Sequence, residues 1–411
     1  MTLRALVVTV VHHPEDARIR HRQIAALLEA GWQVTYAAPF SGYPAASATD
    51  PALTTVDLPR ARGRHRVRAL LAARALLRRE AAHHDLVLLH DPELLLATWR
   101  LDLSPVIWDV HEDTAASMRM KPWLPSALAG PAAHAVRHLE RRAEQHVHLL
   151  LAEERYRERF RRPHLVVPNT TRVPVTTRPP DDPRVVYVGH LSRARGVVEL
   201  VETGALLHRR SGGRLRVQLV GHADSETADL LSRDLPGVEW LGFRPHAEAM
   251  RVLSGALAGL SLLHDQSNYR VSRPTKVVEY AAHGVPVVTT PLPEAARLVE
   301  QTGAGVVVPF VGGRADPASV ADAVLALDAD PVARLRMGTL GHAYAAEHLD
   351  WTRHAATFVD HVSAVARDSV PEDGGPLRRA VHDHVGAADV HQAAPDRELG
   401  PARLRVADLH Q

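Results

Sequence analysis

Cysteine is absent from the 411-residue chain, which excludes a disulfide framework, a thiol nucleophile and a cysteine-ligated metal site. A large charge of one sign is also absent: the formal net charge is only +2, so bulk charge does not indicate a nucleic-acid partner. The apolar run at the N-terminus is far shorter than the roughly 18 residues that a membrane span needs, and no small-residue cleavage site follows it. We therefore expect a cytoplasmic protein whose first apolar run is a β-strand.

Two loop types that cradle phosphate groups are missing as well. The residues after the first expected strand read VVHHPEDAR (residues 10–18) and contain no glycine, so the G-x-G-x-x-G fingerprint of a dinucleotide site is absent. No G-x-x-x-x-G-K-[ST] loop occurs either. A nicotinamide-dependent dehydrogenase is accordingly the least favoured functional class.

Metal-binding patterns are weak. The string DADP (residues 328–331) follows an apolar helical stretch and ends in proline, which favours a turn in solvent. The string DVHED (residues 109–113) offers a single histidine among carboxylates, a poor pattern for a metal site. We therefore expect no metal.

Short β-branched runs alternate with helical segments along most of the chain. Nearly continuous apolar runs of this kind indicate parallel sheets covered by helices on both faces. Because 411 residues are too many for one ordinary core, we expect an α/β protein with two doubly wound sheets. A ligand should bind at the carboxyl ends of the strands, in a cleft between the two domains. The expected strands are residues 6–11, 33–38, 85–90, 105–110, 147–151, 165–167, 185–189, 216–221, 238–242, 257–263, 287–290 and 305–308.

The expected domain boundaries follow from composition. Residues 173–184 read VPVTTRPPDDPR and are rich in proline and aspartate, which is typical of a linker. The chain from residue 367 to residue 411 has no sustained periodicity and is expected to be a disordered tail. The two sheets should therefore occupy residues 1–172 and 185–350.

One short helix carries charges beside a buried strand. In RPTKVVEYAAHGVPVVTT, Pro274 at the first helical position and Gly284 just past the end frame a helix of about ten residues. Lys276, Glu279 and Tyr280 share one face of it. If that face is exposed, the Lys–Glu pair stabilises the helix by only about 0.2–0.5 kcal/mol. If it faces a cleft, the ammonium suits a diphosphate and the carboxylate can accept hydrogen bonds from both hydroxyls of a ribose. The spacing alone leaves both interpretations open.

A basic loop precedes another expected helix. Gly189 ends a strand, Arg193 and Arg195 follow, and Gly196 begins the helix. The unpaired N–H groups of a helix N-terminus and the forked donors of arginine suit a phosphate group. A solvated basic loop is the alternative interpretation.

Taken together, these segments resemble a retaining glycosyltransferase of family 4 (glycosyl transferases group 1). This family has the GT-B fold, in which two Rossmann-like, doubly wound domains face a central cleft. No single segment is specific, but the set occurs in the family's order across roughly residues 1–365. A further stretch that starts at Trp351 resembles the family's last helix, so residues 351–366 should cross back to the first domain. The segments are EDARIRHRQIAALLEAGWQV (15–34), PVIWDVHE (105–112), VVPNT (166–170), YVGHLSRARGVVELV (187–201), VQLVGHA (217–223), VEWLGFRP (238–245) and RPTKVVEYAAHGVPVVTT (273–290).

The resemblance implies roles for individual residues. Arg195 stands at the lysine of the family's G-R-L-x-x-x-K-G motif, which binds the diphosphate, and His190 replaces the motif's arginine. Lys276 matches the family lysine on the diphosphate, and Glu279 matches the glutamate that holds the ribose. His111 matches a histidine that contacts the donor sugar or its leaving phosphate. The other residues implied in donor binding are Gly189, Arg193, Gly242, Phe243, Pro274 and Thr275.

Two features depart from the family's pattern. Val271 stands eight residues before Glu279, where the family's E-x7-E motif has a glutamate that helps to hold the sugar hydroxyls. A subset of the family lacks that glutamate, and SNYRVSRPTK resembles the wording of the subset. The first loop also lacks the glycines that often cradle the donor. In their place stand Asp16 and Arg18, which either contact the donor or acceptor or simply form a helix N-terminus.

The reaction that the resemblance implies is transfer of a sugar, hexosyl in type, from a nucleotide diphosphate sugar to an acceptor hydroxyl. Retention is expected, no metal or other cofactor is needed, and the main task is to stabilise charge on the departing phosphate. The acceptor would be a glycan, a lipid-linked sugar or a small molecule, as in cell-envelope glycan biosynthesis. A sugar-nucleotide epimerase of the same fold and a non-catalytic nucleotide-sugar-binding partner are the alternatives.

A basic stretch suggests where such an enzyme works. From Arg60 to Arg79, eight arginines are interleaved with leucine and valine. A basic amphipathic helix of this kind can lie on an anionic membrane surface, and residues 118–142 add Met, Trp and Leu among further basic residues. We therefore expect a peripheral location at the inner face of the cell membrane. A basic face in solvent is the alternative.

Overall fold

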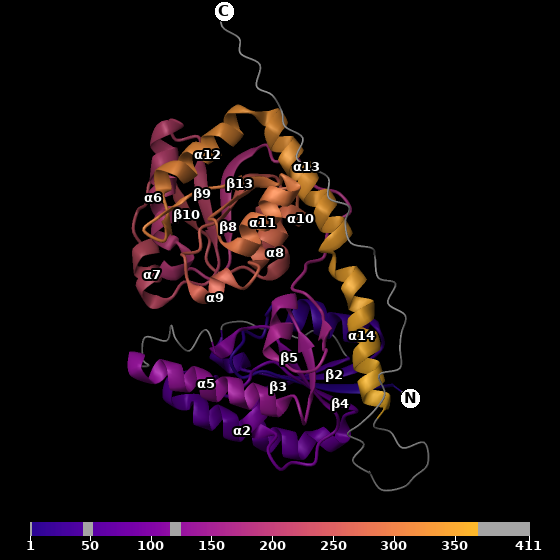
Figure 1. Ribbon diagram of the computed structural model, residues 1–411. Helices are drawn as coiled ribbons and strands as arrows, with labels where there is room; N and C mark the ends of the chain where they lie inside the picture. The colour runs from indigo at the N-terminus through magenta and orange to yellow at the C-terminus, as the bar shows by residue number, and fades with distance from the viewer. Residues whose placement is uncertain (1, 44–51, 116–124, 369–411) are drawn as a thin grey trace, which may run out of the picture. The chain divides into compact units, whose positions relative to one another are not determined.

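Two parallel β-sheets dominate the computed structural model, which describes residues 2–43, 52–115 and 125–368 (Figure 1). The first sheet has seven strands in the order β3-β2-β1-β4-β5-β6-β7, and the second has six in the order β10-β9-β8-β11-β12-β13. Each order starts from a central strand and extends outward in both directions, as in doubly wound folds. The prediction of two parallel-sheet α/β domains is confirmed.

The strand bounds follow the apolar runs closely. The exception in the first sheet is β3, which we did not predict because Thr54 and Thr55 are exposed and interrupt any apolar run. In the second sheet, β8 begins three residues before the expected Val185. The strands are β1 (Arg4–Val8), β2 (Gln33–Ala38), β3 (Leu53–Asp57), β4 (Leu86–Leu89), β5 (Val106–Val110), β6 (His148–Leu151), β7 (Leu165–Val166), β8 (Asp182–Val188), β9 (Arg216–Val220), β10 (Val238–Trp240), β11 (Ala256–Ser261), β12 (Val287–Thr289) and β13 (Gly305–Val307), followed by an antiparallel pair, β14 (Phe310–Val311) and β15 (Arg314–Ala315).

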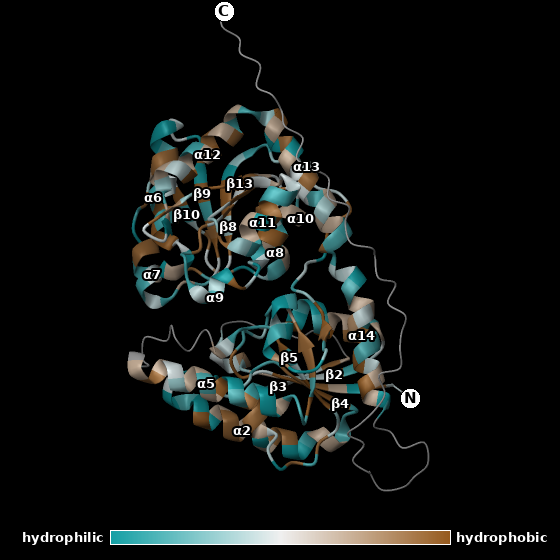
Figure 2. Cartoon of the chain, in the orientation of Figure 1, coloured by the Kyte–Doolittle hydropathy of each residue, from teal (hydrophilic) through white to brown (hydrophobic). Residues whose placement is uncertain are grey.

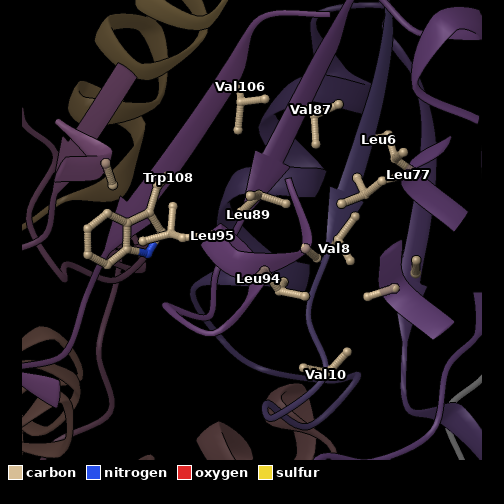
Figure 3. Packing of buried hydrophobic residues seen from close by; sticks show 14 of the residues in the cluster. Leu6, Val8, Val10, Leu77, Val87, Leu89, Leu94, Leu95, Val106 and Trp108 are labelled. Carbon is tan, nitrogen blue, oxygen red and sulfur yellow. The ribbon is translucent and has the colours of Figure 1, made fainter. Parts of the chain in front are cut away.

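Helices cover both faces of the first sheet because its strand residues alternate between two cores. Leu6 and Val8 of β1 point into one core, shown in Figure 3, and Ala5 and Val7 point into the other. The first core is covered by α2 (Arg66–Glu80), α3 (Leu94–Ala97) and α5 (Ser126–Ala143). The second is covered by the π-helical turn η1 (Ile19–Ile24), by α1 (Ala25–Glu29) and by the last helix, α14 (Trp351–Arg367).

The second sheet is built in the same way, and Figure 2 shows its apolar strands between helices of mixed hydropathy. One face packs against α6 (Val197–Arg210), α7 (Ser225–Leu231) and α12 (Pro317–Ala329). The other packs against α8 (His246–Leu253), α10 (Thr275–Ala282), α11 (Pro293–Thr302) and α13 (Pro331–His348). The remaining short helices are η2 (Phe40–Gly42), η3 (Gly63–His65), η4 (Ala81–His83), η5 (Glu154–Arg159), η6 (Arg193–Arg195) and α9 (Ser267–Arg270).

Two segments on which we made predictions lie wholly or partly outside the residues that the structure describes. The expected tail lies outside them, apart from Arg367 and Asp368 at the end of α14. Residues 116–124, part of the second basic stretch, also lie outside them. Within the described ranges, no helix combines the length and the apolar character that crossing a membrane requires.

Candidate functional site

In the second sheet, the chain adds strands outward on one side from β8 to β10 and then on the other side from β11 to β13. The point between β8 and β11 where the direction of winding reverses is the switch point, at which doubly wound sheets bind their ligands. Gly189 follows β8 directly and has a φ of 133°, in the region that favours glycine. A Cβ atom there would lie 3.5 Å from the Lys276 Cε atom. The backbone angle favours glycine at this position, and the end of β8 runs within van der Waals distance of the lysine of α10.

Lys276 is buried, with 5% of its surface exposed. Its Nζ atom donates a hydrogen bond of 3.1 Å to the Tyr187 hydroxyl and lies 4.3 Å from the centre of the same ring. The ammonium makes no other hydrogen bond among the described residues. Burial, and then the charge of Arg195, hold the pKa of Lys276 well below its ordinary value. The amine is therefore short of hydrogen-bond acceptors, and an anionic ligand would both supply them and favour its charged form.

Glu279 lies one turn further along α10 and is also buried, with 6% of its surface exposed. Burial raises the pKa of Glu279, although Arg22 and then Lys276 oppose that rise. The Arg22 Nη2 atom lies 3.7 Å from the carboxylate, too far for a hydrogen bond. Both charges of α10 are thus buried, which excludes the interpretation of the pair as a surface ion bridge. Their acceptor and donor capacity is largely unfilled by the described residues.

The third residue of that face, Tyr280, has a structural role. Its hydroxyl donates to the Leu260 carbonyl at 3.0 Å and accepts from the Val188 N–H at 3.1 Å, which ties β8 to β11. Helix α10 then ends in a Schellman motif: Gly284 has a φ of 68°, and the Val285 N–H donates to the Tyr280 carbonyl at 2.9 Å. We predicted Pro274 as the first residue of the helix. In the structure it is the N-cap, and the helix begins at Thr275.

Arg195 reaches the same place from the loop before α6. Burial lowers the pKa of its guanidinium, but the interactions with Tyr187 and Tyr269 outweigh burial and raise that pKa. Gly196 follows with a φ of 83° as the N-cap of α6. Arg195 and Lys276 thus both interact with Tyr187, and Arg195 directly precedes the N-cap of α6.

Tyr187 is a site residue that the sequence reasoning missed. It is fully buried on β8, and burial raises the pKa of its hydroxyl to about 12, so the phenol keeps its proton. That hydroxyl donates to the His190 carbonyl at 2.7 Å and accepts from Lys276. The signal in the sequence was one polar atom in the apolar run VVYVG.

The other residues implied in donor binding have mixed positions. Desolvation, followed by the charge of Arg195, lowers the pKa of His190, so its imidazole is neutral near pH 7. Arg193 forms a largely exposed ion pair with Glu226 at 2.7 Å instead of approaching Lys276.

Phe243 stacks on His222 with ring centres 4.5 Å apart. Thr275 is exposed at the start of α10, and Gly242 has a φ of 69° in the loop between β10 and α8. The roles of these residues stay predictions.

The first sheet brings a second group of predicted residues together. Arg18 is buried, and its Nε and Nη2 atoms donate to the two oxygens of Asp109 at 2.7 Å each. Its Nη1 atom donates to the Val167 carbonyl at 2.9 Å. Asp16 accepts from the N–H of Arg18 at 2.9 Å and so fixes the start of η1. Because these hydrogen bonds direct the Arg18 side chain into the interior of the first domain, they do not support its predicted contact with a donor or acceptor, which stays a prediction.

His111 lies at the end of β5, between Asp109 and His12. Its Nδ1 atom is 3.2 Å from the Asp109 carbonyl, and its Nε2 atom is 2.9 Å from the His12 Nε2 atom. Burial lowers the pKa of His111, but the hydrogen bond and the charge of Asp109 outweigh it and raise that pKa to about 9. The ligand atoms of His90, Asp109 and His111 lie within 4.8 Å of one another. Since Arg18 already binds the carboxylate in a bidentate pair, we do not assign a metal site here.

Comparisons with known proteins agree with this architecture. Residues 182–330, which hold β8 to β13 and the Lys276 site, match the family model of glycosyl transferases group 1. Sucrose-phosphate synthase from Thermosynechococcus elongatus has a TM-score of 0.67 and 17% identity, covering 90% of this chain and 100% of that one. WaaG, a glycosyltransferase involved in lipopolysaccharide biosynthesis, has a TM-score of 0.65 and 11% identity, covering 88% and 100%. Anabaena HepE in complex with UDP-glucose has a TM-score of 0.61 and 13% identity, covering 88% and 100%. No curated protein matches the chain.

At these identities the similarity establishes the fold. The two sheets of this chain and of its neighbours form the GT-B architecture, so the predicted fold class is confirmed.

Proposed function

We propose that the protein is a glycosyltransferase that moves a sugar from a nucleotide diphosphate sugar to an acceptor hydroxyl, with retention and without a metal. The observation that carries the proposal is the pair of buried ionisable side chains on α10, which are only partly satisfied by the described residues. Lys276 and Glu279 lie at the switch point of the sheet, inside the segment that matches the family model. A buried charge without partners costs stability, and a bound ligand would offset that cost.

Each residue has a defined task in this proposal. Lys276, Arg195 and the N–H groups at the start of α6 bind the diphosphate and stabilise the charge that develops as it departs. Glu279 accepts hydrogen bonds from the ribose hydroxyls. Tyr187 holds Lys276 in place before the donor arrives, so little reorganisation is needed during the reaction. His111 contacts the donor sugar or the leaving phosphate, and that phosphate accepts the proton of the acceptor hydroxyl.

The substrates follow by similarity. A solved neighbour was captured with UDP-glucose, so a UDP-hexose is the first donor to test. The proposed acceptor is a glycan, a lipid-linked sugar or a small molecule of cell-envelope glycan synthesis. Hexosyl transfer at the inner face of the cell membrane is the biological role that we propose.

A surface on α2 supports the membrane part of this proposal. Val67 and Leu71 expose 66% and 60% of their surface, and Leu96 and Trp99 of the neighbouring α3 segment are about half exposed. Helix α2 packs against α3, so the four apolar side chains lie on adjacent elements. Exposed arginines lie on α2 and just before it, as is typical of basic helices that lie in a membrane interface. These arginines are Arg62, Arg64, Arg66, Arg68, Arg78 and Arg79.

The test of the function is a panel of nucleotides. Thermal unfolding would be followed with UDP, GDP, ADP and dTDP and with their sugars, because a ligand that binds the folded state raises the melting temperature. We expect one nucleotide and its sugars to stabilise the protein. NMR of the products would then separate transfer from epimerisation, which needs no acceptor, and from binding without turnover. Absence of a shift with every compound would contradict the proposal.

A further inference from the structure

The switch point of the first sheet holds a group of polar residues that the proposed function does not use. Asp91, the second residue after β4, is buried. Its Oδ2 atom accepts from the Thr9 hydroxyl at 2.9 Å and from the Val10 and Val11 N–H groups at 2.5 and 3.2 Å. The Thr9 hydroxyl also accepts from the His12 N–H at 3.1 Å. Thr9, at the end of β1, therefore fixes both the carboxylate of Asp91 and the backbone of His12.

His12 is placed between this carboxylate and His111. Its Nε2 atom lies 2.9 Å from His111 Nε2 and 3.3 Å from Asp91 Oδ1. Asp91 Oδ1 is buried and has no hydrogen-bond partner among the described residues. Because two ring nitrogens 2.9 Å apart can be bonded only if one donates and the other accepts, the two histidines cannot be protonated independently.

The geometry of the pair limits it to one additional proton, because two fully protonated rings would direct two N–H donors at each other across 2.9 Å. Three carboxylates pair with the rings, those of Asp16, Asp91 and Asp109, and they favour keeping that proton. The raised pKa of His111, about 9, agrees with a proton retained at neutral pH. The groups that face the rings are Asp16 and Arg18 at the start of η1, His90, Asp91 and Glu93 after β4, and Asp109 and Glu112 around the end of β5.

We propose that His12 and His111 act as one unit that shares a single additional proton, and that His12 Nδ1 presents this charge to an oxygen atom of the substrate. His111 Nδ1 is engaged by Asp109, and both Nε2 atoms are engaged with each other. His12 Nδ1 is the ring nitrogen of the pair that makes no hydrogen bond among the described residues; its nearest acceptor, Asp16 Oδ2, is 4.0 Å away. The side chain of His12 is also the more exposed of the two, at 16% against 9%.

The substrate atom rests on the proposed function: it is an oxygen of the departing diphosphate or of the sugar that the diphosphate carries. The pair donates a charge-assisted hydrogen bond to that oxygen and keeps its proton, so the proton balance of the transfer is unchanged. In this arrangement His12 makes the contact. His111, for which the proposed function above gives a direct contact, is in this inference a positioning residue that acts through His12.

The first experiment measures protonation and does not depend on activity. The histidine side chains of the full-length protein would be titrated by ¹H–¹⁵N NMR, in the wild type and in Asp91→Asn. We expect one protonation event to shift the signals of both rings, and its midpoint to fall when the carboxylate charge is removed. Independent titration of the two rings near pH 6.5, unaffected by Asp91→Asn, would overturn the shared proton.

The second experiment measures the role toward substrate. UDP should shift the signals of His12 more than those of His111, and the kcat/KM of the wild type should fall as pH rises through the midpoint of the pair. His12→Gln should lose at least tenfold in kcat/KM together with that alkaline limb, while His146→Gln, an exposed control, should not. An unchanged pH profile in His12→Gln would overturn the contact. If no nucleotide binds at all, the proposed function fails while the NMR titration still decides whether the proton is shared.

Discussion

At the scale of single residues, burial decides what a charge can do in this protein. Arg193 is paired with Glu226 in solvent, where such a pair contributes at most about 1 kcal/mol. Arg18 is buried but satisfied by Asp109. Lys276 is buried with one hydrogen-bond acceptor. Three cationic residues of similar appearance in the sequence thus lie in three environments: a solvent-exposed ion pair, a buried and satisfied ion pair, and a buried position with a single hydrogen-bond acceptor.

We expect Lys276→Ala and Glu279→Ala each to lower kcat/KM at least tenfold, which corresponds to about 1.4 kcal/mol of transition-state stabilisation. Because Lys276 has a single hydrogen-bond acceptor, Lys276→Ala should not lower the melting temperature much, whereas Glu279→Ala should lower it because the buried Arg22 loses the carboxylate that faces it. Steady-state kinetics and thermal unfolding would be measured together. Glu300→Ala on the neighbouring α11 is a matched control, since its carboxylate is exposed. Turnover close to that of the wild type in both variants would refute the proposed donor-binding roles of Lys276 and Glu279.

At the scale of elements, the candidate site depends on how helices begin. Helix α6 starts at Gly196, where an added Cβ atom would lie 2.2 Å from the Leu262 carbonyl oxygen. Glycine therefore lets the N-terminus of α6 approach the residue that follows β11. Gly31 has nearly the same backbone angle, 82° against 83°, but nothing lies within 4 Å of its Cβ position. Substituting alanine at each of the two glycines would therefore separate two losses of folding free energy: backbone strain alone at Gly31, and strain plus a steric clash at Gly196.

We expect Gly31→Ala to destabilise the protein by about 1 kcal/mol, which is the cost of a left-handed alanine. Gly196→Ala should cost a further 1–3 kcal/mol or so because the added methyl group collides with the backbone of Leu262. Urea unfolding of both variants would measure the difference. Equal losses of stability would show that α6 can shift away from β11 at little cost.

At the scale of the whole molecule, the C-terminal helix completes the first core. Trp351 and Phe358 of α14 are fully buried and pack with Ile24 and Leu27 of the N-terminal segment. This face of the first sheet is therefore closed by residues from both ends of the described chain. The opposite face carries α2, so the proposed membrane surface and α14 lie on different sides of the sheet.

We expect the full chain to sediment with vesicles of phosphatidylcholine and phosphatidylglycerol at physiological salt, and not with phosphatidylcholine alone. Each basic residue near an anionic surface contributes about 1 kcal/mol, so the double variant Arg64→Glu and Arg68→Glu should weaken binding at least tenfold. The same change at Arg209 and Arg233, which are exposed on the second sheet's helices and loops, should have little effect. Equal binding by both double variants, or none by the wild type, would remove the membrane from the proposal.

The sequence by itself determined the alternation of strands and helices, because apolar periodicity reports which side chains must leave water. It placed Lys276, Glu279 and Gly284 correctly on one helix and its end, since spacing and turn chemistry are local. It did not reveal β3, whose exposed threonines interrupt the apolar pattern. It also could not show that Arg18 faces Asp109, 91 positions away along the chain.

Only the tertiary structure decided which of these charges lack partners. Whether Lys276 of α10 is exposed or buried depends on Tyr187 of β8 and on Gly189, which follows that strand. The contact between His12 and His111 likewise joins residues 99 positions apart. The electrostatic state of a side chain is set by whatever surrounds it in space, and chain spacing carries little information about neighbours that come from different strands.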